Sequence, residues 1–169
     1  MRTMETLDTG EVLRRFRDAH PVTGEESRAG NEYVEGVLRL AADQRGGRWR
    51  RVALDGGEIA GILLPWHTGE NGGREPVPPA GATVAEAAAT LRAWGGDYPD
   101  TNPGCWGRIS WLAGAPHGPL FLSEGAVDHP FYERMERRDG LVHLDGLHRM
   151  LAWTLWDRVP ARAQAYVAG

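Results

Sequence analysis

The residues best suited to chemistry lie close together near the end of the chain, as Asp-Gly-Leu-His-Arg at positions 145–149. A carboxylate, an imidazole and a guanidinium within five positions can exchange protons and bind an anion. The preceding run, Leu141 to Leu144, is short and apolar and predicts a strand, whereas Met150 to Trp156 is rich in helix formers. We therefore expect the motif where a strand turns into a helix that runs to about Asp157.

A helix start at this point predicts an anion site. The first N–H groups of a helix have no partners within it, and that end carries partial positive charge. Arg149 adds a planar guanidinium suited to phosphate or carboxylate, while Gly146, Leu147 and His148 would complete the binding site. Asp145 and His148 are the predicted catalytic residues, and Asp145 is also a candidate magnesium ligand. The structural alternatives are a helix cap for Asp145, a hydrogen-bonding role for His148, and a plain surface or ion-pair role for Arg149.

The same stretch resembles the ParB/sulfiredoxin-like superfamily, in which a strand, Asp-Gly-x-His-Arg, a helix and a further short strand follow one another. The resemblance covers about Leu120 to Val167, with Ala163 to Val167 as the closing strand. It implies that the junction holds nucleotide phosphates, as in partition proteins with a nucleotide switch and in kinases of free serine. Sulfiredoxins carry a catalytic Cys just before the His-Arg pair, but this chain has Leu147 there, which does not support sulfinic acid reduction.

A metal site is an alternative interpretation of the same residues. His143, Asp145 and His148 form His-x-Asp-x-x-His, and two histidines with a carboxylate can hold iron or zinc. On a strand His143 and Asp145 point to one face, whereas His148 already belongs to the helix. Such a site would need the turn to fold His148 back, or another ligand. The candidates for that ligand are His67, His117 and His129.

The composition excludes several mechanisms. All 19 basic residues are Arg, so Schiff-base, pyridoxal and Walker-type P-loop chemistry, each of which needs Lys, is excluded. The single cysteine, Cys105, excludes an internal disulfide and an all-Cys zinc site. With a distant His it could act as a nucleophile, but no family signature surrounds it, and an inert buried thiol is the favoured interpretation.

Length and charge set the remaining bounds. A chain of 169 residues predicts a single domain, and its net charge of −4 argues against nucleic acid as a partner. No apolar run is long enough for a membrane span, and Met1 to Glu11 lacks the apolar core of a signal peptide. We therefore expect a cytoplasmic protein whose partner is a small molecule or nucleotide.

Local signals predict the other elements. Capping boxes predict helix starts at Asp8 and Thr83, and a helix with an apolar stripe over Tyr33 to Ala41 ends at Gly46-Gly47. Three further elements are predicted towards the end of the chain: a strand over Pro119 to Ser123, a charged helix over Asp128 to Arg138 and a strand over Ala161 to Val167. Asp55-Gly56 predicts a hairpin turn between strands over Trp49 to Leu54 and Glu58 to Leu64. Thr68 to Gly81 and Asp97 to Gly107 are predicted loops.

These elements predict a mixed α/β or α+β single domain. Residues 1–115 would form helices and a hairpin, packed on a small C-terminal sheet within residues 118–169 that contains the strand–motif–helix–strand unit. Three functions remain open. The favoured one is a small-molecule enzyme, of the phosphotransferase type, that binds a nucleotide with magnesium or a phosphorylated ligand. The others are a non-catalytic nucleotide-binding or regulatory module and a metal-dependent small-molecule enzyme.

Overall fold

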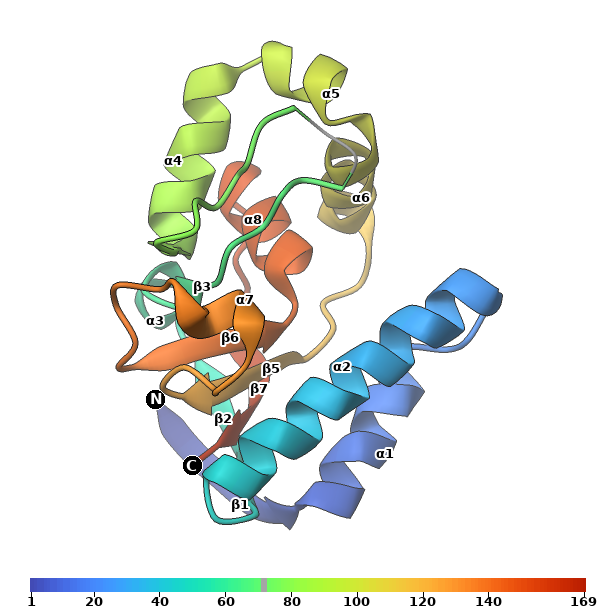
Figure 1. Ribbon diagram of the computed structural model, residues 1–169, viewed down its shortest axis with the longest axis vertical. Coiled ribbons are helices and arrows are strands. Elements are labelled where there is room, and N and C mark those ends of the chain that lie inside the picture. The colour runs from blue at the N-terminus through green and yellow to red at the C-terminus, as the bar shows by residue number, and fades with distance from the viewer. Residues whose placement is uncertain (71–72) are drawn as a thin grey trace.

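The central strands carry apolar side chains on both faces, which requires a helical layer on each side of the sheet. In β5 (Leu120–Glu124), Leu120 and Leu122 belong to one buried cluster and Phe121 belongs to the other. The computed structural model that establishes this describes residues 1–70 and 73–169. The result is a mixed α/β domain with one sheet between two helical layers (Figure 1).

In the described residues, seven strands form one sheet in the order β1-β2-β7-β5-β6-β3-β4. The pairs β7–β5 and β6–β3 are parallel, and the other neighbouring pairs are antiparallel. Besides β5, the strands are β1 (Arg2–Asp8), β2 (Arg48–Leu54), β3 (Leu63–Leu64), β4 (Ala82–Thr83), β6 (Leu141–Asp145) and β7 (Ala163–Ala168).

Two sets of helices cover the faces. Helices α1 (Thr9–Ala19), α2 (Glu25–Gln44) and α7 (Pro130–Glu133) pack on the face that carries Phe121. Helices α3 (Gly56–Ala60), α4 (Val84–Trp94), α5 (Asp97–Thr101), α6 (Pro103–Gly114) and α8 (Leu147–Leu155) pack on the opposite face. Figure 1 shows α1 and α2 side by side across the lower part of the molecule, with α4, α5 and α6 grouped at the other end.

The predicted strand-to-helix junction is confirmed. Strand β6 ends at Asp145, Gly146 is the N-cap of α8, and α8 ends at Leu155, two residues short of the predicted Asp157. The closing strand is also present in the same sheet, as β7. The capping signals are confirmed too, since the side chains of Asp8 and Thr83 accept hydrogen bonds from backbone N–H groups in the first turns of α1 and α4.

The sheet is larger than predicted, and the predicted hairpin is wrong. Residues 1–115 contribute four of the seven strands, among them β1, a polar strand at the sheet edge. Asp55-Gly56 begins α3 because Asp55 and Glu58 form a reciprocal capping box, which competes with the turn signal. Of the second predicted hairpin strand only Leu63–Leu64 forms a strand, which pairs in parallel with β6 and antiparallel with β4.

The predicted loop over residues 97–107 is also wrong. It forms α5 and the start of α6, where Pro103 lies in the first turn, a position that needs no N–H donor. The predicted charged helix over 128–138 is limited to α7, with Tyr132 and Met135 buried as expected and Phe131 exposed. The other predicted loop, 68–81, includes residues 71–72, which lie outside the described residues. In its described part Val77 is buried and pairs with His67 in a β-bridge.

None of the helices in residues 1–70 and 73–169 combines the length and the apolar character that crossing a bilayer requires.

The junction generates a stability prediction. Gly146 has a φ of 110°, and a Cβ there would lie 2.6 Å from Cδ2 of the buried Leu120. Gly146→Ala should therefore lower the free energy of unfolding by at least about 1–2 kcal/mol, measured by urea denaturation. The matched control is Gly36→Ala in α2, where a Cβ meets no atom within 4 Å. It should raise stability by about 0.5–1 kcal/mol, and equal effects of the two changes would contradict the assignment.

Candidate functional site

Asp145 ends β6 without capping the helix that follows. The N-cap is Gly146, and no side chain caps α8, so the cap interpretation of Asp145 is wrong. The Asp145 carboxylate instead faces α1, where its Oδ2 lies 3.3 Å from Nε2 of His20. This is an ion-pair contact without the alignment of a hydrogen bond.

His20 is held in place by Phe16. Its Nδ1–H donates to the Phe16 carbonyl oxygen at 2.9 Å, and the two rings stack with centroids 4.3 Å apart. Burial opposes the charged form of His20, but the Asp145 carboxylate outweighs it and raises the pKa of His20. Burial likewise disfavours the charged carboxylate, yet His20 lowers the pKa of Asp145 below its usual value. The two residues form a largely buried ion pair between β6 and the end of α1.

Arg149 lies on the first turn of α8, where the sequence predicts it. Its guanidinium donates a hydrogen bond to the Pro119 carbonyl and lies close to the backbone of Gly118. Among the described residues no carboxylate lies within 4.0 Å of the guanidinium, so the ion-pair alternative is wrong. The guanidinium is half-buried. One of its five N–H donors is used by the Pro119 carbonyl, and the others form no hydrogen bond with the described residues.

The imidazole of His148 meets residues far away in the sequence. One ligand atom from each of His67, Cys105 and His148 lies within 4.8 Å of the others, and Cys105 Sγ lies 3.6 Å from Nε2 of His67. The rings of His67 and His148 are nearly perpendicular, with centroids 4.9 Å apart. The predicted set His143, Asp145 and His148 is not brought together in this way among the described residues. His117 and His129 also lie outside the group, and only His67 of the three suggested additional ligands joins it.

Burial keeps this group uncharged. It raises the pKa of Cys105 to about 11, with Tyr98 nearby acting in the opposite direction, so Cys105 is a thiol and not an activated nucleophile. Burial also lowers the pKa of His67 and lowers that of His148 well below its usual value. Because of these lowered pKa values, the imidazoles of His67 and His148 are neutral, and each has a lone pair available.

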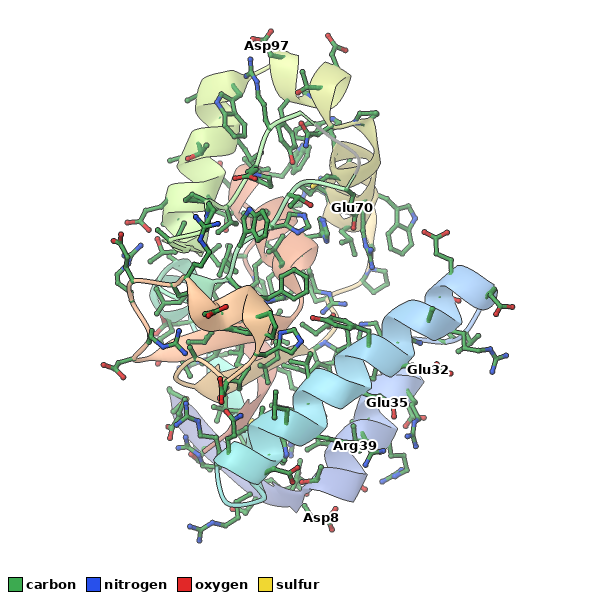
Figure 2. All side chains as sticks on the ribbon, in the orientation of Figure 1. Asp8, Glu32, Glu35, Arg39, Glu70 and Asp97 are labelled. Carbon is green, nitrogen blue, oxygen red and sulfur yellow. The ribbon has the colours of Figure 1, made fainter. Side chains whose placement is uncertain are left out.

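Glu70 borders the same group. Its Oε1 lies 3.6 Å from Nε2 of His148 and 3.2 Å from a guanidinium nitrogen of Arg108. The backbone of Glu70 has a φ of 45°, an uncommon conformation for a residue with a side chain. Figure 2 shows Glu70 beside α6, between the upper helices and the sheet.

A comparison with protein-family models gives a match over the whole chain. Residues 1–169 match the model described as a family of unknown function (DUF6309). The chain belongs to this family. No curated protein and no solved structure matches it.

This DUF6309 chain leaves several buried polar atoms without hydrogen-bond partners among the described residues. Three of them lie within six residues at the junction: His143 Nδ1, Asp145 Oδ2 and His148 Nε2. Burial lowers the pKa of His143 to about 4, so that ring is neutral as well. Each such atom costs free energy unless a ligand or water pairs with it. Two surface hollows, one lined by Trp106 and Trp156, do not include these residues, so the centre is separate from both.

The sequence predicts part of this centre. The local motif identifies Asp145, His148 and Arg149, the metal alternative adds His143, and His67 is named only as a possible additional ligand. Cys105 was expected to be an inert thiol, and its contact with His67 spans 38 residues. His20 and Glu70 carry no sequence signal that separates them from other polar residues in the chain.

The His20–Asp145 pair predicts a pH-dependent stability. The raised pKa of His20 means that its contribution is fully present below about pH 6.5 and is lost as pH rises through the folded-state pKa. The lowered pKa of Asp145 means that its contribution is lost only in strong acid. His20→Gln should therefore cost on the order of 1 kcal/mol near pH 5 and less above about pH 8, measured by urea denaturation. A pH-independent cost, or the same pattern in the exposed control His117→Gln, would refute the ion pair.

Proposed function

We propose that this protein is a small-molecule enzyme whose active centre is the polar cluster at the β6–α8 junction. The observation that carries the proposal is that three atoms, His143 Nδ1, Asp145 Oδ2 and His148 Nε2, are buried without a well-aligned hydrogen bond among the described residues, although Asp145 Oδ2 makes an ion-pair contact with His20. Natural interiors pair nearly all such atoms, and exceptions concentrate at sites that bind or react. A ligand bound at the junction would supply hydrogen-bond partners to those of these atoms that it reaches.

The ligand we propose is anionic. Helix α8 begins with N–H groups that no side chain caps, and its positive end favours negative charge. Arg149 sits on the same turn, with donors beyond the one that the Pro119 carbonyl accepts. A phosphate or carboxylate at this place would receive charge-assisted hydrogen bonds from the guanidinium and from the backbone.

Asp145 and His148 are the residues we propose for chemistry. His20 keeps Asp145 in its charged form, which suits a base or a magnesium ligand. His148 is neutral and presents an unpartnered Nε2. A nucleotide bound with magnesium, and phosphoryl transfer from it, is the specific form of this proposal. It is supported by the likeness of residues 120–167 to the ParB/sulfiredoxin-like superfamily, which stays a prediction.

Ligand binding tests the proposal directly. In a thermal-shift screen with and without magnesium, a nucleotide or phosphorylated compound should raise the melting temperature of the full chain by mass action. Arg149→Ala should weaken that binding about ten- to a hundredfold, the effect of one lost charge-assisted contact. The control Arg39→Ala changes an exposed arginine of α2 and should leave affinity unaltered.

Two outcomes separate the alternatives. Binding without turnover, retained in Asp145→Asn, would indicate the non-catalytic regulatory module. Failure of every anionic compound to stabilise the chain, or equal affinity in wild type and Arg149→Ala, would reject the anion site. Arg149→Ala also removes the donor to Pro119, so its unfolding free energy should fall by about 0.5–1.5 kcal/mol, and affinities must be compared where both proteins are folded.

A further inference from the structure

Next to the proposed anion site, three chain segments bring two histidines and the cysteine close together. His67 follows β3, Cys105 lies on α6, and His148 lies on α8. Helices α6 and α8 pack against each other, which brings their side chains to the segment after β3. The contact between His67 and Cys105 therefore depends on the tertiary fold.

The donor set of this group points to a metal of a particular kind. One thiolate, formed when a bound metal displaces the proton of Cys105, and two imidazoles are soft and intermediate ligands, which select zinc and related transition metals and disfavour magnesium and calcium. The three ligand atoms lie within 4.8 Å of one another, so one ion can reach all of them with small side-chain rotations. His148 Nε2 is buried and has no hydrogen-bond partner among the described residues, which a metal bond would remedy.

The side chain of Asn102 connects the segments that carry this group. Asn102, buried just before α6, donates from Nδ2 to the carbonyls of Gly69 and Arg74 and accepts from the Arg74 N–H. Gly69 has a φ of 81°, and a Cβ there would lie 2.1 Å from Asn102 Nδ2, so the contact requires glycine. These bonds fix the segment that carries His67 against the helix that carries Cys105. A site whose ligands are positioned in advance needs little rearrangement to bind.

We propose that His67, Cys105 and His148 bind one zinc-class transition metal ion. Three protein ligands leave a fourth tetrahedral position open, as in catalytic zinc sites, whereas structural sites use four. The Glu70 carboxylate lies beside His148 and forms an ion pair with Arg108. The site takes a metal of a different class from the proposed magnesium, by different residues, and shares only His148 with the proposed anion centre.

Metal titration of the full-length chain tests the proposal. After treatment with a chelator, Co²⁺ should bind with a stoichiometry of one and give a thiolate-to-metal charge-transfer absorption, and Zn²⁺ should displace it. Cys105→Ser should abolish that absorption, and His67→Gln should weaken Co²⁺ binding at least tenfold, since even loss of an outer-shell partner costs about 10–100-fold. The matched control His117→Gln removes a histidine outside the group and should bind like wild type.

A measurement on the wild-type protein covers the case in which the variants do not fold. X-ray absorption of the zinc-loaded chain should show one sulfur ligand at about 2.3 Å and nitrogen ligands at about 2.0–2.1 Å. Absence of a sulfur ligand, or of stoichiometric binding, would overturn the proposal. Arg149→Ala should leave metal affinity unchanged while it weakens anion binding, so failure of one proposal is distinguishable from failure of the other.

Discussion

Burial of the central strands on both faces is the constraint on which the other features depend. In β7, Ala165 and Val167 pack towards α4 and α8, while Tyr166 and Ala168 pack towards α1 and α2. A sheet of this kind needs helices on each side, and these helices enclose the end of β6. Polar side chains that lie there are largely buried. Their unpaired atoms and shifted pKa values are consequences of the layered fold.

The same enclosure acts differently on neighbouring residues because their charged neighbours differ. Asp145 stays ionised because His20, from the opposite helical layer, lies 3.3 Å away. His148, three residues later, faces His67 and Cys105 and is neutral. Within four positions the chain thus moves from a charged environment to a neutral one with available lone pairs. The first environment suits proton or magnesium chemistry, and the second suits transition-metal coordination.

Local signals were sufficient for much of the fold. The junction, the helices that begin at capping residues and the closing strand were predicted because each depends on a few adjacent residues. Errors arose where two local signals compete, as at Asp55, or where tertiary packing overrides composition, as in α6. That helix contains Gly104 and Gly107, which disfavour helices, and it is stabilised by Cys105 and Ile109 packed in the core. β1 lacks apolar alternation because it is exposed at the sheet edge.

The residues of the candidate site also divide into those predicted by a local signal and those that depend on tertiary contacts. Asp145, His148 and Arg149 share a local motif, whereas His67 and Cys105 join them through contacts that no spacing rule encodes. His148 belongs to both groups, and its chemistry limits it to one role at a time. The Nε2 of a neutral imidazole has a single lone pair, which either coordinates a metal or accepts a proton. With a metal on Nε2, the ring can only donate from Nδ1, and proton transfer at this centre would fall to the Asp145 carboxylate or to Glu70.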